Sequence, residues 1–168
     1  MSNTDYFQNF KYDDVKTINA NIGKKYSFAV EVYKDIIAAE GGKTNNADAK
    51  AINLDKIKNS FCLPQPPASM DFTQVVTKEK KSYFVLVDCK FNVKFSSLKS
   101  ITKKSIQDKV CFSKKLLSVN NETFVPYPMY FFLFSDEKFS QIRNTWSRKL
   151  NNDPNYIAIC KSEYEVIF

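Results

Sequence analysis

This chain of 168 residues contains no histidine. Without an imidazole ring it cannot form a Ser-His-Asp triad, a Cys-His pair or a His-ligated zinc site. Catalytic chemistry would therefore have to come from carboxylates, Lys, Tyr or Cys. The four cysteines form no Cys-x-x-Cys pair, so the sequence does not support a tetrathiolate zinc site.

Long hydrophobic runs and arginine are also scarce. No run approaches the roughly 18–20 apolar residues that cross a membrane, and residues 1–14 are polar and acidic, unlike a secretion signal. We therefore expect a soluble, cytoplasmic protein without a membrane partner. The net charge of +7 comes almost entirely from lysine, with arginine only at Arg143 and Arg148. Lysine favours contact with the backbone of a nucleic acid over readout of its bases.

The length and the hydrophobic content of 43% predict one folded domain over residues 1–168. Two segments are expected to lie outside its core. Residues 1–14 are expected to form an aromatic N-terminal arm that docks on the core or on a second subunit. Residues 43–67 are expected to make a surface excursion, because their proline cluster disrupts regular structure.

Apolar spacing predicts helices and strands in mixed order. We expect helices over 15–39, 47–57, 102–118 and 137–150, and strands over 68–76, 82–91, 93–95, 127–134 and 156–160. The first two strands flank a charged turn at 77–81 and predict a β-hairpin. This order is typical of an α/β fold, with a mixed central sheet flanked by helices.

The predicted helix at 102–118 is amphipathic, with Ile106, Val110 and Leu117 on one stripe. Its other face is cationic. This face is either a solvated surface or a track for phosphate groups. The lysines expected on it are Lys103, Lys104, Lys109, Lys114 and Lys115.

Three residues at the ends of the hairpin strands stand out as a candidate site. Asp71 lies near the start of the first strand, and Asp88 and Lys90 lie at the end of the second. Because side chains alternate along a strand, Asp88 and Lys90 share a face, and the hairpin brings Asp71 beside them. The alternatives are that Asp71 is a turn acid, and that Asp88 and Lys90 are an exposed ion pair.

Such a group of residues suits the hydrolysis of a phosphodiester bond. Two carboxylates can hold Mg²⁺ or Mn²⁺, and a lysine can orient the attacking water or stabilise charge on the phosphate. We therefore expect a nucleic-acid partner, with contacts to the DNA backbone. A non-catalytic binding or inhibitor protein on the same scaffold is the alternative.

The residues Pro67 to Asp71, followed by Asp88-Cys89-Lys90, resemble the motif of the PD-(D/E)xK, or restriction-endonuclease-like, nuclease superfamily. The resemblance extends to the order of elements from about Val15 to Phe134. It implies an αβββαβ core, Asp71 and Asp88 as metal ligands, and Lys90 as the catalytic lysine. The short chain is expected to act as a homodimer or within a larger complex.

Many relatives in that superfamily carry a further acid on the first helix. Glu31 and Glu40 are the two candidates here. On a helix with 100° per residue, Glu40 falls on the apolar stripe of Ile22, Tyr33 and Ile36, whereas Glu31 points away from it. The phase therefore favours Glu40 as a third metal ligand.

Overall fold

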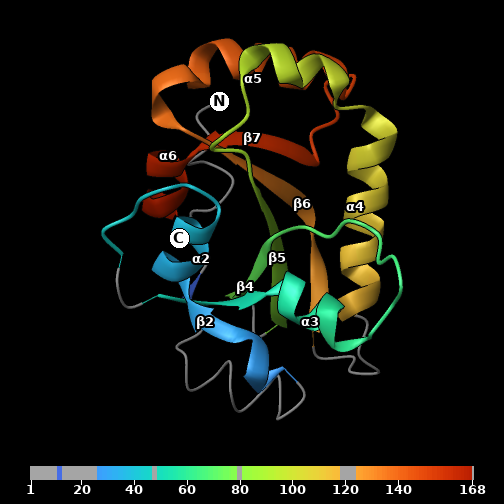
Figure 1. Ribbon diagram of the computed structural model, residues 1–168. Coiled ribbons are helices and arrows are strands. Elements are labelled where there is room, and N and C mark those ends of the chain that lie inside the picture. Colours follow the sequence, from blue (N-terminus) through green and yellow to red (C-terminus); the bar gives the residue numbers. More distant parts are fainter. Residues whose placement is uncertain (1–10, 13–25, 47–48, 79–80, 118–123, 168) are drawn as a thin grey trace.

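The computed structural model describes residues 11–12, 26–46, 49–78, 81–117 and 124–167. Within these ranges a central sheet is flanked by helices (Figure 1). The strands are β1 Lys11–Tyr12, β2 Val30–Val32, β3 Lys50–Asn53, β4 Phe72–Lys78, β5 Lys81–Cys89, β6 Phe124–Phe134 and β7 Tyr156–Cys160. The α-helices are α2 Tyr33–Ala39, α3 Leu54–Ser60, α4 Lys103–Leu117, α5 Phe139–Lys149 and α6 Lys161–Ile167. Short 3-10 helices cover Ser27–Ala29, Phe95–Ser100 and Asp136–Lys138.

The sheet is mixed, and its order is β2-β3-β4-β5-β6-β7, with β1 pairing to β4. The pairs β2–β3, β3–β4 and β4–β5 are antiparallel, whereas the pairs β5–β6 and β6–β7 are parallel. The parallel pairs are joined by α4 and by α5, as parallel strands require crossover connections. This architecture confirms the α/β class with a mixed central sheet.

Two apolar clusters cover the two faces of the sheet. On one face, buried residues of α4 and α5 such as Val110 and Trp146 pack with Phe84 and Phe132 of the strands. On the other face, α2 and α6 contribute Ile37 and Tyr164. Figure 1 shows α4 on one side of the sheet and α2 with α6 on the other. The hydrophobic side chains of β5 therefore alternate between two buried layers.

Helix α4 matches the helix expected at 102–118 and begins at a reciprocal cap. The hydroxyl of Thr102 accepts from the amide of Ser105 at 3.1 Å, and the hydroxyl of Ser105 accepts from the amide of Thr102 at 3.2 Å. This arrangement satisfies amide groups that a helix start leaves without a partner. The cap fixes where the helix starts relative to β5.

Three expectations about secondary structure are wrong. The helix expected at 15–39 is broken in its described part, because β2 occupies Val30–Val32 and pairs with β3, leaving only α2 as helix. The helix expected at 47–57 begins with strand β3 and continues as α3. The strand expected at 93–95 is absent from these described residues, where Phe95 begins a 3-10 helix.

The segment 43–67, expected as a surface excursion, enters the fold instead. Strand β3 lies inside the sheet between β2 and β4, and Ile52, Leu54 and Ile57 are buried in the core. Continuous exposure is found at 59–67, which includes the proline cluster, while Lys43, Asn45 and Lys56 are exposed singly. Most of the expected N-terminal arm at 1–14, all but residues 11–12, lies outside the described residues.

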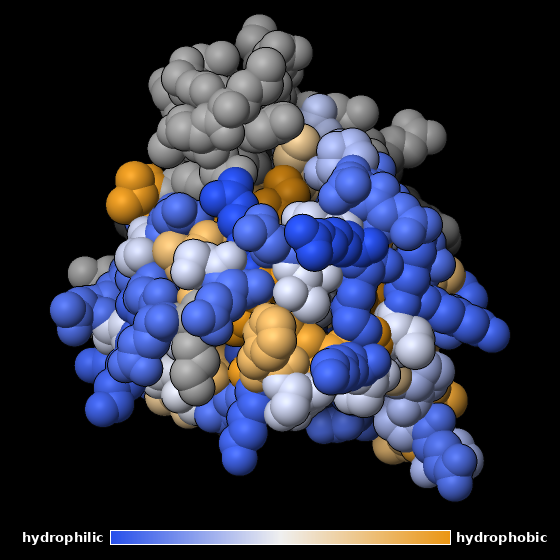
Figure 2. Space-filling model, turned by 90° about the horizontal axis from the view of Figure 1, so that it is seen from above, coloured by the Kyte–Doolittle hydropathy of each residue, from blue (hydrophilic) through white to orange (hydrophobic). Residues whose placement is uncertain are grey.

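The surface above the sheet is mainly hydrophilic. Seen from above, where α5 lies, it shows polar side chains around a small apolar area (Figure 2). Arg143 and Arg148 are exposed on α5. Among the described residues no helix is long and apolar enough to cross a membrane.

Candidate functional site

The register of the β4–β5 hairpin brings Asp71 to the end of β5. Phe72 pairs with Val87, and the amide of Asp71 donates to the carbonyl of Val87 at 3.0 Å. The Oδ2 atom of Asp71 accepts a hydrogen bond from the amide of Cys89 at 2.5 Å. The carboxylate of Asp71 is thereby anchored to the backbone between Asp88 and Lys90.

Asp88 and Lys90 form an ion pair on one face of β5, as strand alternation predicts. Asp88 is fully buried, and 17% of the Lys90 side chain is exposed. The amide of Lys90 donates to the carbonyl of Leu133 on β6 at 2.7 Å, which fixes the residue to the neighbouring parallel strand. Burial of Asp88 rules out the alternative of an exposed surface pair.

A second lysine, Lys109 on α4, forms ion pairs with both carboxylates. Its Nζ atom donates a hydrogen bond to Oδ1 of Asp88 and lies 3.5 Å from Oδ1 of Asp71. About a fifth of the Lys109 side chain is exposed. The site therefore combines two acids from adjacent strands with two ammonium groups, one from a strand end and one from a helix.

Helix α4 is held against the start of β4 by Ser113. The Ser113 hydroxyl accepts from the amide of Met70 at 2.7 Å and donates to the carbonyl of Lys109 at 2.9 Å. Ser113 and Met70 are both buried. This contact links the residue before Asp71 to the helical turn that carries Lys109, so one buried hydroxyl aligns two parts of the site.

Glu40 caps the C-terminal end of α2 near the same site. Asn92 donates to the Glu40 carbonyl at 3.2 Å, and Gly41 adopts a φ of 84° beside it. A Cβ atom on Gly41 would lie only 2.4 Å from Nδ2 of Asn92, so this turn requires glycine. In contrast, Glu31 on β2 is hydrogen-bonded to Asn53 at 2.6 Å and paired with Lys56.

The electrostatic balance of the site raises the pKa of Asp71 to about 7. Burial is the main cause, and the negative charge of Asp88 adds to it; Lys109 and the Cys89 amide act in the opposite direction. The Glu40 charge also contributes, so Glu40 lies within electrostatic range of Asp71. For Lys109, burial works against the ammonium form, but Asp88 and Asp71 outweigh it and raise the pKa.

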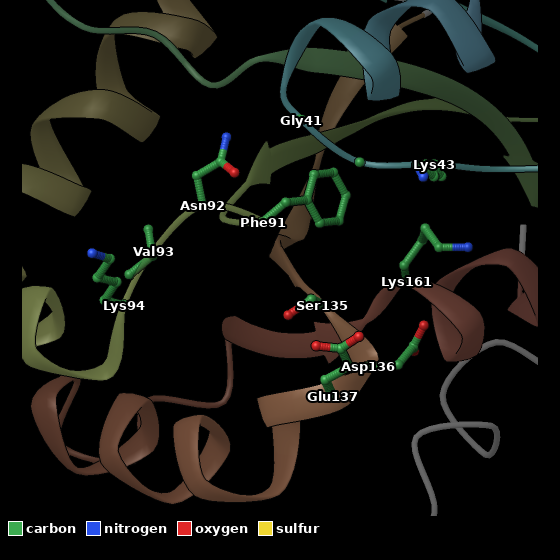
Figure 3. A pocket seen from close by; sticks show the side chains of 11 residues that line it. Gly41, Lys43, Phe91, Asn92, Val93, Lys94, Ser135, Asp136, Glu137 and Lys161 are labelled. Carbon is green, nitrogen blue, oxygen red and sulfur yellow. The ribbon is translucent and has the colours of Figure 1, made fainter.

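Two cavities adjoin these residues and share Val93 in their linings. A cavity of about 270 Å³ is lined by Asp88, Lys90, Lys109 and apolar residues. The lining of a larger cleft of about 570 Å³ includes Phe91 and Asn92 (Figure 3). Its lining includes three lysines that come from separate segments: Lys43, Lys94 and Lys161. Asp88 therefore lines the smaller cavity, whereas the larger cleft meets the site only through Val93 and has Asp136 and Glu137 in its own lining.

No family model, curated protein or solved structure matches this chain. Its function is therefore inferred from the chemistry of the site itself.

The two gathered carboxylates suit a hard divalent cation. Oxygen ligands are those that Mg²⁺ prefers, and one or two carboxylates are its usual protein contribution. Oδ2 of Asp88 is buried and accepts no hydrogen bond, although Lys90 lies against it. Among the described residues no three acidic or cysteine side chains are grouped to hold one ion. Asp71 and Asp88 could therefore hold Mg²⁺ or Mn²⁺ as a pair, and a role for Glu40 as third ligand stays a prediction.

Sequence reasoning missed Lys109 as a site residue, because it was expected on the outer cationic face of its helix. One feature of the sequence indicates that Lys109 lies near the buried face of its helix. At 100° per residue, Lys109 lies only about 60° from Ile106, at the border of the apolar stripe. A lysine at such a border can bury its stem and still bring its ammonium group to a buried acid.

Proposed function

We propose that this chain is a metal-dependent, nuclease-like protein that hydrolyses phosphodiester bonds in nucleic acids, with DNA as the expected substrate. The observation that carries the proposal is the meeting of Asp71, Asp88 and Lys90 at one end of the β4–β5 hairpin. Charged groups buried together in this way are uncommon without a function, because burial of a carboxylate is unfavourable.

The order of elements supports the same proposal. Helix α2, strands β3, β4 and β5, helix α4 and strand β6 come in the αβββαβ order expected for a restriction-endonuclease-like core, with α3 inserted between β3 and β4 and a 3-10 helix between β5 and α4. Asp71 directly precedes β4, and Asp88 and Lys90 lie at the end of β5, as the motif of that superfamily requires. A fold by itself hosts many functions, so the side chains carry more weight.

The residues of the site have different roles in the proposed reaction. Asp71 and Asp88 would hold Mg²⁺ or Mn²⁺. When bound, such an ion polarises the phosphate and lowers the pKa of a coordinated water. Lys90 places its ammonium group beside Asp88, where it can orient the attacking water or stabilise negative charge on the phosphate. Lys43 and Lys94 of the neighbouring cleft suit the backbone of the substrate, whereas Lys161 is paired with Glu165 and the lining also includes Asp136 and Glu137.

A non-catalytic binding or inhibitor protein on the same scaffold is the second candidate. The observation in its favour is that Lys109 and Lys90 already form ion pairs with the two carboxylates. Such a protein would bind a partner without turnover.

Cleavage of plasmid or branched DNA with Mg²⁺ or Mn²⁺ separates the two candidates. We expect the wild type to cut, Asp88→Asn to abolish cutting and Lys90→Met to slow it by about 10²–10³-fold, with the fold of both variants retained by circular dichroism. Asp108→Asn, which removes an exposed acid from α4, serves as the matched control and should cut normally. DNA binding without cutting by the wild type would instead support the binding protein.

A further inference from the structure

We propose that Lys109 is a built-in competitor for the divalent cation: its ammonium group occupies the cation position between Asp71 and Asp88 and must leave before a metal ion binds. This inference rests on the proposed function. The site geometry provides its first support, because Nζ of Lys109 bonds to Asp88 and lies 3.5 Å from Asp71.

Lys109 and Lys90 differ in how they contact the acids. Lys90 lies against Oδ2 of Asp88, whereas Lys109 faces Oδ1 of Asp88 and Oδ1 of Asp71 together. Asp71 and Asp88 would hold a divalent ion through their carboxylate oxygens, and Lys109 already contacts one oxygen of each. The ammonium group and a divalent ion would therefore repel each other and compete for the same oxygen atoms.

The buried acids need a cation in either state. Asp88 is fully buried, and 12% of the Asp71 side chain is exposed, so two uncompensated charges there would strongly destabilise the fold. In the metal-free protein Lys90 pairs with Asp88, and Lys109 supplies the charge that both acids share. Asp71 and Asp88 would exchange this shared ammonium group for a divalent ion when they hold one.

The lysine has room to leave without movement of its helix. The carbonyl of Lys109 is held by the Ser113 hydroxyl at 2.9 Å, and Ile106 and Val110 anchor α4 in the core. Only the four-carbon stem of Lys109 has to change rotamer. The cavity of about 270 Å³ beside it, whose lining includes Ser105 and Lys90, provides the space.

Titration with Mn²⁺ by isothermal calorimetry tests this competition without any measurement of cleavage. We compare the wild type with Lys109→Met, which removes the ammonium group, and with Lys109→Arg, which keeps a cation. Lys104→Met is the matched control, because it removes an exposed lysine from the same helix. A Lys109→Met/Asp88→Asn double variant shows whether the ion binds at this site, and Lys109→Gln replaces Lys109→Met if the latter does not fold.

We expect Lys109→Met to bind Mn²⁺ about tenfold more tightly than the wild type, as expected for loss of a buried competing charge. Lys104→Met and Lys109→Arg should remain close to the wild type, and the double variant should lose binding. Binding by a folded Lys109→Met that is equal to or weaker than that of the wild type would overturn the competition but leave the nuclease proposal intact.

The remaining outcomes distinguish this inference from the proposed function. If only Lys109→Met binds Mn²⁺, Lys109 excludes the ion and the wild type is a binding protein rather than a nuclease. If neither protein binds Mn²⁺, both the competition and the metal-dependent function are wrong.

Discussion

The hydroxyl of Ser113 on α4 accepts the amide proton of Met70 at 2.7 Å, across 43 residues of sequence. Met70 directly precedes Asp71, and Ser113 lies one helical turn after Lys109, to whose carbonyl it also donates. Both residues are buried. The relative position of the strand acid and the helix lysine is therefore set by one hydrogen bond in the core.

Replacement of Ser113 by Ala should destabilise the protein. The variant leaves the buried Met70 amide without its acceptor, and an unsatisfied buried donor lowers the free energy of unfolding by about 1–3 kcal/mol. Urea denaturation followed by circular dichroism measures this change. Ser140→Ala on α5 is the control, because Ser140 is exposed, and it should change stability by less than about 0.5 kcal/mol. A Ser113→Ala variant as stable as this control would contradict the role given to the bond.

The hairpin was predictable because its local signals agree with its tertiary pairing. Alternating apolar residues on both sides of a charged turn predicted β4 and β5, and strand alternation placed Asp88 and Lys90 on one face. Strand β7 matches the predicted segment 156–160. In these segments the apolar residues show no helical spacing that would compete with the prediction of a strand.

The failures arose where tertiary pairing overrides local periodicity. Val32 fits a helical pattern, yet it pairs with Lys50 of β3, a strand that itself lay inside a predicted helix. Each strand is too short to be recognised without the other. The role of Lys109 depends on how α4 packs over the ends of β4 and β5, so the helix sequence alone could not establish its contacts.

The raised pKa of Asp71 predicts a pH dependence of stability in the metal-free protein. Its pKa is about 7 in the folded protein against 3.8 ordinarily, so between these values the folded state holds a proton that the unfolded state has lost. The contribution of protonated Asp71 to the free energy of unfolding is therefore full below pH 3.8, and it is lost as the pH rises through 7. Between about pH 5 and pH 8 this loss is about 3 kcal/mol, at about 1.4 kcal/mol per pKa unit.

The Asp71→Asn variant isolates that contribution, because an amide of the same shape does not titrate. We expect its free energy of unfolding, relative to the wild type, to rise by about 3 kcal/mol from about pH 5 to pH 8. Urea denaturation in the presence of EDTA at a series of pH values measures the difference. Parallel pH profiles for the two proteins would show that Asp71 ionises normally.

Lys90 is expected to affect turnover and not metal binding. Its ammonium group lies against Asp88 but is not itself a ligand for a cation, so Lys90→Met should retain Mn²⁺ binding within a few-fold. We expect its rate of DNA cleavage to fall by about 10²–10³-fold, the usual effect of removing one group that stabilises developing charge. Calorimetry and a cleavage assay on the same preparation measure the two quantities. Equal losses in both would make Lys90 a structural partner of Asp88.

The lysines of the larger cleft should determine how DNA binding depends on salt. Lys43 and Lys94 line this cleft and are exposed, so both can reach a phosphate. Each neutralised phosphate adds about 0.9 to the slope of log K against log salt, so Lys43→Ala and Lys94→Ala should each lower that slope by about 1. Fluorescence anisotropy with labelled DNA at several salt concentrations, in EDTA to prevent cleavage, measures this slope.

The matched control is Lys34→Ala. Lys34 lies on the first turn of α2, at the other end of that helix from Gly41, which lines the cleft. A decrease of the same size in this control would mean that the whole basic surface, and not the cleft, attracts the nucleic acid.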